Sequence, residues 1–394
     1  MAQKSIGILA DQIRGVSYKK KDLHDTLDKN SVILLRANNI INGELDFTDV
    51  LYVDKSVVSD TQYLKYGDIL ISASSGSKKA IGKAASFNSQ YKCTFGAFCK
   101  IIRPHENVRD FSRIYFQSSA YRRQISHLAL GANINNIRNE HINSLQLEIP
   151  NEITRKKIVN KLDLLKKIIT EKQKILADLD ELIKARFVEM FGDAGQLNLN
   201  FKVSKLGEVA DVKSSHRVFT KDFVNTGIPF YRGKEISLLA KGSPISETYF
   251  ISKELYEKLL DEKTRPKLND LLMPSICDKG QIWRVNTRAP FYYKDGRVLC
   301  ISPKKEIFNS IYLQQYMKFK TKIEYRKLGT GSTFAEFKIF QLKNMQIIIP
   351  PLSLQNEYAT FVQQVDKSKF ENIVYLNKTL SSKILSQLGD AIRD

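Results

Sequence analysis

Two stretches of the chain, GANINNIRNEHINSLQLEIP (residues 131–150) and GSTFAEFKIFQLKNMQIIIP (residues 331–350), follow the same plan 200 positions apart. Each begins at a glycine, continues through a polar segment and ends in an apolar strand that closes on Ile-Pro. Similarity at a fixed separation is typical of a duplicated structural unit. These two stretches therefore predict two copies of one domain in a single chain.

Other segments keep the same register. VILLRANNI (residues 32–40) matches IPFYRGKEI (residues 228–236) and pairs Arg36 with Arg232, while YGDILIS (residues 66–72) is similar to LNDLLMPS (residues 268–275). The offsets of these collinear pairs stay between 196 and 202, so we favour duplication over convergent strand and turn chemistry. In the first copy, short apolar runs at 32–35, 69–71, 98–102 and 145–149 predict strands, and hence a strand-rich α+β domain.

A helix-forming segment follows each copy. Residues 151–191 contain neither proline nor glycine, and their apolar residues recur at the 3.5-residue spacing of a helix that packs on another helix. Gly192 is expected to end the first helix in a left-handed cap. The predicted helix–helix interface consists of Ile158, Leu162, Leu165, Ile169, Leu176, Leu179 and Ile183 in the first segment, and of Val365, Ile373, Leu376, Leu380 and Ile384 in the second.

The expected architecture is therefore α+β and pseudo-two-fold symmetric, with two similar domains separated by two long antiparallel coiled-coil helices. The expected boundaries are residues 1–150 for the first domain, 151–193 for the central spacer helix, 194–350 for the second domain and 351–394 for the C-terminal spacer helix. A surface helix packed on its own domain is the alternative. We favour the paired helices because about 35 residues at 1.5 Å per residue span about 50 Å, more than one such domain needs.

The composition excludes several classes of protein. The chain has 394 residues, of which 42% are hydrophobic and 26% are charged, and no apolar run approaches the length of a membrane span or of a signal peptide core. The cysteines, Cys93, Cys99, Cys277 and Cys300, lack the spacing of a zinc site and are expected to be small buried residues. These features favour a cytoplasmic protein and exclude a membrane protein or a disulfide scaffold.

The net charge of +20 is unevenly distributed along the chain. Residues 1–150 carry +6 and residues 194–350 carry +12, whereas residues 151–193 carry +2 and residues 351–394 carry none. Two basic domains on nearly neutral helices suit two contacts with one long polyanion. Lysine and arginine neutralise phosphates, and Asn, Ser, Thr and Arg hydrogen-bond to base edges. The candidate DNA-binding residues are Arg36, Ser74, Ser75, Ser77, Lys78, Lys79, Arg122, Arg123, Asn133, Asn135, Asn136 and Arg138 in the first copy, and Arg232, Lys234, Ser275, Lys279, Lys320, Lys322, Arg326, Ser332, Thr333 and Lys338 in the second.

No convincing catalytic constellation accompanies these basic residues. The sequence has no phosphate-binding GxxxxGK[ST] loop and no Asn-Pro-Pro-aromatic or Asp-Pro-Pro-Tyr signature of an amino-methyltransferase. Glu336 and Lys338 match half of a nuclease metal site, but the first copy has Asn136 and Arg138 at the corresponding positions. Three hypotheses stay open: a sequence-specific DNA-binding subunit, a stand-alone nuclease that uses Glu336, and a nucleic-acid-binding scaffold without sequence preference.

The whole chain resembles the specificity subunit of type I restriction-modification systems. The resemblance rests on IRGVSY (residues 13–18), YGDIL (residues 66–70), GST with MQIIIPP (residues 331–333 and 345–351), and ARFVEMFGD (residues 185–193). The first copy departs from the family at Ala132 and Asn133, where Ser-Thr is typical, and at Asn151, where a second proline is usual.

The resemblance implies DNA binding without catalysis. In such subunits two target-recognition domains each recognise one half of a bipartite DNA site, and the two helices set the gap and dock two modification subunits. The expected partners are therefore double-stranded DNA, two adenine methyltransferase subunits and the restriction subunits, with no membrane partner. No cofactor is expected on this chain, since S-adenosylmethionine, ATP and Mg²⁺ would be bound by the partner subunits.

Overall fold

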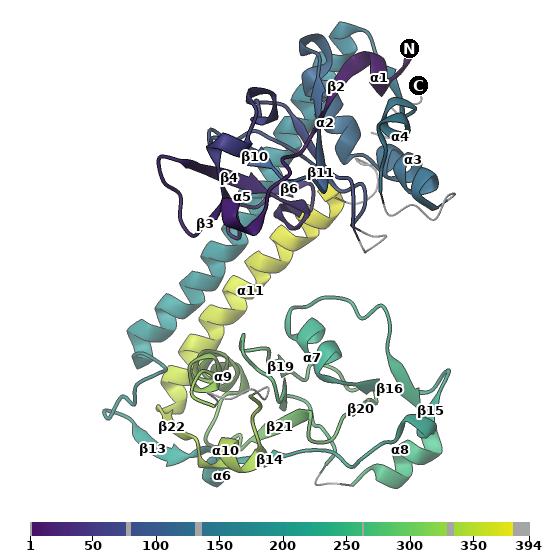
Figure 1. Ribbon diagram of the computed structural model, residues 1–394. Helices are drawn as coiled ribbons and strands as arrows, with labels where there is room; N and C mark the ends of the chain where they lie inside the picture. Colours follow the sequence, from purple (N-terminus) through teal and green to yellow (C-terminus); the bar gives the residue numbers. More distant parts are fainter. Residues whose placement is uncertain (1, 76–79, 131–135, 262–263, 329–334, 381–394) are drawn as a thin grey trace. The chain divides into compact units, whose positions relative to one another are not determined.

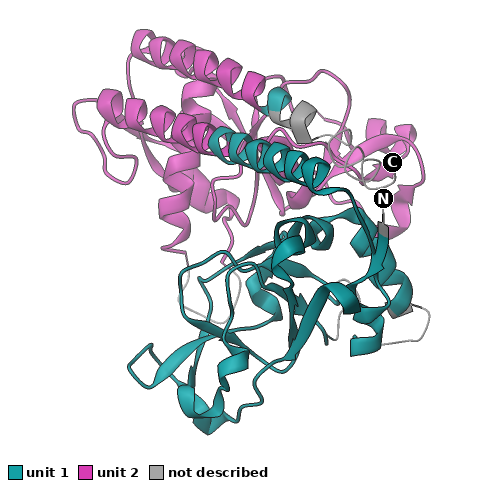
Figure 2. Ribbon diagram, turned by 90° about the horizontal axis from the view of Figure 1, so that it is seen from above, with its two compact units in different colours: residues 1–172, 373–394 teal, residues 173–372 magenta. Residues whose placement is uncertain are grey.

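The computed structural model describes residues 2–75, 80–130, 136–261, 264–328 and 335–380 (Figure 1). The chain forms two compact units, residues 1–172 with 373–394 and residues 173–372 (Figure 2). Two long helices, α5 (Glu152–Phe191) and α11 (Leu352–Leu380), each contribute residues to both units. These units divide the chain within the two helices, whereas the expected domain boundaries lie at residues 150, 193 and 350. The expected boundaries stay a prediction.

The strands and short helices form two domains. The N-terminal domain consists of β1 (Ala2–Ser5), α1 (Ile6–Leu9), β2 (Ala10–Arg14), β3 (Leu23–His24), β4 (Ser31–Leu35), β5 (Ile40–Ile41), β6 (Glu44–Leu45), β7 (Leu51–Asp54), β8 (Ile69–Ser72), β9 (Ala84–Ser86), β10 (Cys93–Phe95), β11 (Cys99–Pro104), α2 (Arg109–Gln117), α3 (Ser119–Leu130), α4 (Asn139–Asn143) and β12 (Gln146–Ile149). The C-terminal domain consists of β13 (Lys202–Lys205), α6 (Leu206–Val209), β14 (Ala210–Lys213), β15 (Phe223–Val224), β16 (Ile228–Tyr231), α7 (Gly233–Ala240), β17 (Tyr249–Ile251), α8 (Lys253–Leu259), β18 (Leu271–Pro274), β19 (Trp283–Arg284), β20 (Tyr292–Tyr293), β21 (Val298–Pro303), α9 (Ser310–Tyr325), α10 (Ile339–Asn344) and β22 (Gln346–Ile349).

The sheets of the two domains have the same topology. The orders β1-β12, β2-β11-β8-β9 and β10-β4-β7-β3 correspond strand by strand to β13-β22, β14-β21-β18-β19 and β20-β16-β17-β15. The register is conserved as well, since Ala2 pairs with Ile149 and Lys202 pairs with Ile349. The predicted duplication of a strand-rich α+β domain is therefore confirmed. The four strands expected in the first copy are present as β4, β8, β11 and β12.

A shared turn explains the similarity of YGDIL and LNDLL. Gly67 and Asn269 have positive φ angles of 84° and 76°, a backbone conformation that glycine and asparagine tolerate best. The next residue is a buried aspartate in each domain, and its carboxylate accepts a hydrogen bond from the backbone N–H three residues earlier, at 2.8 Å in both cases. The turn therefore positions β8 and β18 in the same way.

The carboxylates of these two turns have different partners. In the N-terminal domain, Arg103 forms a two-bond ion pair with Asp68, with Nε–Oδ1 and Nη2–Oδ2 distances of 2.9 and 2.7 Å. In the C-terminal domain, Ser302 occupies the strand position of Arg103, because it pairs with Asp211 as Arg103 pairs with Asp11. Burial accordingly raises the pKa of Asp270 above its usual value.

The two long helices pack against each other in antiparallel orientation within the unit of residues 173–372. Arg186 Nη2 lies 2.7 Å from Glu357 Oε1, and Lys369 Nζ lies 2.6 Å from Asp180 Oδ1. Residue numbers thus fall along α5 as they rise along α11. Gly192 ends α5 with a φ of 84°, which confirms the predicted left-handed cap.

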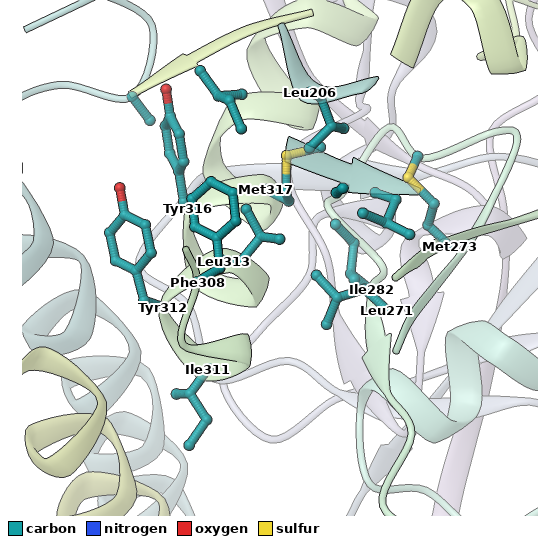
Figure 3. Close-up of a cluster of buried hydrophobic side chains, with 14 of the residues drawn as sticks. Leu206, Leu271, Met273, Ile282, Phe308, Ile311, Tyr312, Leu313, Tyr316 and Met317 are labelled. Atoms are coloured by element: carbon teal, nitrogen blue, oxygen red, sulfur yellow. The ribbon is translucent and has the colours of Figure 1, made fainter. Parts of the chain in front are cut away.

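An aromatic cluster joins both helices to the core of the C-terminal domain. Phe187 and Phe191 of α5 are buried against Tyr312 of α9 and Tyr358 of α11. Tyr312 and Tyr316 follow one face of α9, and they belong to the same buried cluster as Leu313, Met317 and the β18 residues Leu271 and Met273 (Figure 3). The helices are therefore continuous with a domain core and do not pack only on each other.

The residues of the predicted helix–helix interface do not all lie between the two helices, because several pack on the domain cores. Ile158 and Leu162 pack on the core of the N-terminal domain, and Leu179, Ile183 and Val365 belong to the core that contains the aromatic cluster. Ile373 is 41% exposed, so it does not lie in a closed interface. Leu165, Ile169 and Leu176 are half-buried on α5. Ile384 and the side chains of Leu376 and Leu380 lie outside the described residues.

The four cysteines are buried, as predicted. Burial raises the pKa of the Cys93 and Cys99 thiols to about 12 and that of Cys277 to about 11. A thiol with so high a pKa stays protonated and unreactive at neutral pH. In the described part of the chain, no helix combines the length and the apolar character that crossing a bilayer requires.

Candidate nucleic-acid interface

Each domain has a pocket at the ends of the same three strands. In the N-terminal domain the segments that follow β4, β8 and β10 enclose about 490 Å³, and the lining residues are Tyr18, Arg36, Ala37, Asn38, Ser74, Ser75, Gly96, Phe98 and Cys99. In the C-terminal domain the segments that follow β16, β18 and β20 enclose about 370 Å³, and the lining residues are Arg232, Gly233, Lys234, Ser237, Pro274, Ser275, Ile276, Lys294 and Arg297. The duplication thus provides two equivalent pockets.

Arg36 and Arg232 occupy the same place in the two pockets, immediately before a 3-10 helix (Ala37–Asn39) and before α7, respectively. The backbone N–H of Arg36 donates to Asn39 Oδ1 at 2.8 Å, and that of Arg232 donates to Glu235 Oε2 at 2.9 Å. Each arginine is thereby fixed immediately after its strand. The sequence alignment that paired Arg36 with Arg232 is therefore correct in three dimensions.

The two guanidinium groups differ in how firmly they are positioned. Arg232 forms a two-bond ion pair with the fully buried Glu235, and its guanidinium carbon lies 4.4 Å from the centroid of the Tyr249 ring. Burial of Glu235 opposes its ionisation. The hydrogen bonds that Glu235 accepts from Arg232 outweigh this effect and lower the pKa of its carboxyl group. Among the described residues, Arg36 has 3.4 Å contacts to Asp49, and its buried Nε has no hydrogen-bond partner there. Arg36 is thus more loosely bound than Arg232.

In both domains the described end of the repeated motif is hydrogen-bonded to the residue that follows β8 or β18. The backbone N–H of Ile137 donates to Ala73 O at 2.7 Å, and that of Phe337 donates to Ser275 O at 2.8 Å. Ser74 also forms a β-bridge with Asn136. Asn136, Ile137 and Phe337, at the described end of each motif, therefore lie beside the ends of β8 and β18.

Glu336 occupies a cationic environment beside the C-terminal pocket. Its carboxylate accepts hydrogen bonds from Arg297, Lys338 and, at 3.3 Å, the Ser275 hydroxyl. The hydrogen bond from Lys338 and the nearby Arg297 lower the pKa of this carboxyl. Two positive charges thus already compensate the glutamate that the nuclease hypothesis requires as a metal ligand.

Other predicted residues lie outside the two pockets. Arg122 Nη1 donates to Ile81 O at 2.8 Å, and Arg138 lies 3.4 Å from Glu140. Lys320 is 4% exposed and burial lowers its pKa, which disagrees with its prediction as a DNA-binding residue. The side chains of Arg123, Lys279, Lys322 and Arg326 are exposed away from the pocket linings. The predicted Ser77, Lys78, Lys79, Asn133, Asn135, Ser332 and Thr333 lie outside the described residues.

Several lining residues were not predicted from the sequence, among them two aromatic and two basic side chains. Tyr18 and Phe98 line the N-terminal pocket, and Lys294 and Arg297 line the C-terminal one. Phe98 and Arg297 each directly precede the strand that pairs with β8 or β18. Extending the repeat alignment across β10 and β20 would have revealed this correspondence.

The fold and the two pockets define a protein made of two copies of one pocket-bearing α+β domain, with two antiparallel helices. The chain belongs to the family described as the type I restriction modification DNA specificity domain, whose model matches residues 4–181 and again residues 198–381. The two matches agree with the duplication in the structure.

Individual relatives agree with this family. The chain is 37% identical over 206 residues to the EcoKI specificity subunit of Escherichia coli and 36% identical over 184 residues to the StySPI specificity subunit of Salmonella potsdam. These alignments cover 52% and 46% of this chain but only 41% and 40% of the two relatives. A specificity subunit of Methanocaldococcus jannaschii is 23% identical over 75% of this chain and 69% of its own length.

Solved structures share the fold at low sequence identity. An S subunit of the type I restriction-modification system from M. genitalium has a TM-score of 0.52 at 13% identity, covering 99% of this chain and 94% of that chain. A chain from a structure that describes the assembly and conformational transition of a type I restriction-modification system has a TM-score of 0.54 at 15% identity, covering 99% and 96% of the two chains.

Proposed function

We propose that this chain is the DNA specificity subunit of a type I restriction-modification complex, in which each domain recognises one half of a bipartite site. The observation that carries the proposal is the pair of equivalent pockets, each with an arginine and a serine at matching strand ends. One fold with two sets of lining residues suits two half-sites of different sequence. The recognition domains would be residues 1–150 and 194–350.

The charges favour DNA as the ligand. The two domains carry +6 and +12, and four of the residues that line the C-terminal pocket are cationic. Contacts between such cationic side chains and DNA phosphates supply affinity and orientation, whereas a few base contacts supply specificity. Close relatives in the family are named as specificity subunits, which favours sequence-specific binding over a scaffold without sequence preference.

The long helices would act as a spacer. The spacer segments, residues 151–193 and 351–394, carry +2 and 0, so they offer little attraction for phosphates. In our proposal they set the distance between the two half-sites and dock two adenine methyltransferase subunits. Methylation with S-adenosylmethionine and cleavage with ATP and Mg²⁺ would then take place on partner subunits, and this chain would contribute recognition only.

The nuclease hypothesis predicts metal-dependent cleavage by the purified chain and its loss in Glu336→Ala. The contacts of Glu336 with Arg297 and Lys338 disfavour this hypothesis, since a metal ion would have to displace both cations. In our proposal the purified chain leaves duplex DNA intact with or without divalent metal, and Glu336 positions Arg297 at the pocket.

The salt dependence of DNA binding tests whether the C-terminal pocket contacts phosphates. Lys234→Ala and Lys294→Ala are each expected to reduce the magnitude of the slope of log K against log salt by about 0.9, because one phosphate contact and its counterion release are lost. The slope comes from fluorescence anisotropy titrations of the assembled complex at several salt concentrations. The control is Lys253→Ala, on α8 and outside the pocket lining. Unchanged slopes in both pocket variants would place the DNA elsewhere.

The experiment for the proposed function is genome-wide mapping of methylated adenine in cells with and without this chain. The expected result is a bipartite motif, two short sequences with a fixed gap, that is lost on deletion and restored by the intact gene. An identical methylation pattern in both strains would contradict the proposal.

A further inference from the structure

One of the positions at which the two pockets differ lies at the end of a turn that both domains share. The parallel pairs Phe95–Leu35 and Tyr293–Tyr231 show that β10 and β20 end at the same place in their domains. The turns that follow lead directly into β11 and β21. Phe98 is the last residue of the first turn, and Arg297 is the last residue of the second.

Phe98 is presented to solvent on a rigid turn. Its side chain is 71% exposed, although its backbone carbonyl accepts hydrogen bonds from the N–H groups of Ala73 and Ser74, both at 3.0 Å. The turn is closed by Cys99 N–H to Gly96 O at 2.9 Å, and Gly96 N–H donates to Leu35 O at 2.9 Å. These bonds fix the backbone of the turn, and because the phenyl ring also lines the pocket, it offers an apolar contact surface to a ligand there.

The surroundings of Phe98 are also less charged than those of Arg297. Tyr18, Ala37 and Cys99 line the N-terminal pocket, where Arg36 is the one cation among the described lining residues. The C-terminal pocket has Arg232, Lys234, Lys294 and Arg297. The N-terminal pocket therefore suits an apolar group next to a hydrogen-bond acceptor, and the C-terminal pocket suits acceptors and phosphates.

We infer that Phe98 is a specificity-determining residue that packs on the 5-methyl group of a thymine in the half-site of the N-terminal domain. The inference rests on the proposed function and adds to it the chemical group that this pocket recognises. Among the base edges of the major groove, only thymine offers an apolar substituent. Arg297 would take the equivalent place in the C-terminal domain and contact a hydrogen-bond acceptor.

The test replaces the thymine methyl by hydrogen. The full chain, assembled with its modification subunit, is titrated with duplexes in which each thymine of the N-terminal half-site is changed in turn to deoxyuridine. One of these changes is expected to weaken binding by the intact complex about fourfold, the value of one buried methyl-sized group. Phe98→Ala is expected to bind the thymine and deoxyuridine duplexes equally. Tyr66→Ala is the control, because Tyr66 is 65% exposed in the same domain but outside the pocket lining, and this variant should keep the fourfold difference.

Three results would overturn the inference while the proposed function stands. These are a half-site without thymine, intact complex that is insensitive to every deoxyuridine change, and a Phe98→Ala variant that keeps the full thymine preference. In each case binding would still depend on the DNA sequence. Equal affinity of the intact complex for unrelated duplexes would instead contradict the proposed function itself. Circular dichroism of the Phe98→Ala complex verifies that the variant is folded.

Discussion

Replacing Phe187 by alanine is expected to lower the free energy of unfolding of the unit that contains residues 173–372 by about 3–5 kcal/mol. Phe187 is 1% exposed, and its ring lies 5.2–6.0 Å from the rings of Phe191, Tyr312, Tyr316, Phe319 and Tyr358. These neighbours belong to α5, α9 and α11, so the alanine variant leaves a cavity where three helices meet. Urea denaturation followed by circular dichroism measures the loss.

The control for this variant is the adjacent Val188→Ala. Val188 is 44% exposed on the same helix, and its replacement is expected to change the free energy of unfolding by no more than about 0.5 kcal/mol. Equal midpoints of unfolding for the two variants would mean that α5 is not anchored in the aromatic cluster. Phe187→Leu should fall between the intact chain and Phe187→Ala, because leucine fills part of the cavity.

Replacing Arg103 by methionine is expected to destabilise the N-terminal domain by about 3–5 kcal/mol. The side chain of Asp68 is 1% exposed, and Arg103 provides its ionic partner. Methionine conserves much of the apolar stem of arginine but removes the charge, so a buried carboxylate is left without compensation. Removing one partner of a buried ion pair costs more than the pair contributes. Thermal unfolding of the purified chain measures the effect.

The double variant Arg103→Met with Asp68→Asn separates charge from packing. Asparagine carries no charge and its side-chain oxygen can still accept the hydrogen bond from Lys65 N–H, which is 2.8 Å long. The double variant is therefore expected to recover most of the stability that Arg103→Met loses. A double variant as unstable as the single one would show that Arg103 acts through packing and its 2.9 Å hydrogen bond to Tyr63 O, and not by compensating the charge of Asp68. The C-terminal domain already has the combination of Asp270 and Ser302 at these positions, so the fold does not require the arginine.

The duplication and the secondary structure could be predicted because they depend on local chemistry that both copies repeat. The offset of 200 between the two quoted stretches is also the offset between the β1–β12 and β13–β22 registers. The positive φ angles of Gly67 and Asn269 explain why different residues mark the same turn. The C-terminal end of α5 could likewise be predicted from Gly192, which has a positive φ angle.

The candidate site was predicted only in part, because side-chain direction depends on tertiary packing. Arg36, Arg232 and the serines after β8 and β18 were found from the repeat. The burial of Lys320 does not follow from the charge of its segment, because it depends on which face of the helix the residue occupies. Tyr312, Tyr316 and Lys320 are spaced by four residues, so in a helix they share the buried face. Phe98 could not be predicted as a pocket residue, because the sequence does not distinguish an exposed phenylalanine from one in the core.

The central claim, two equivalent domains that each recognise one half of the DNA site, is tested most directly by a domain exchange. Residues 1–150 are replaced by the corresponding domain of a family member with a different recognition sequence, and methylated adenine is mapped across the genome. The account predicts a new motif in which one half and its methylated adenine change while the other half is unchanged. A motif in which both halves change together would contradict it.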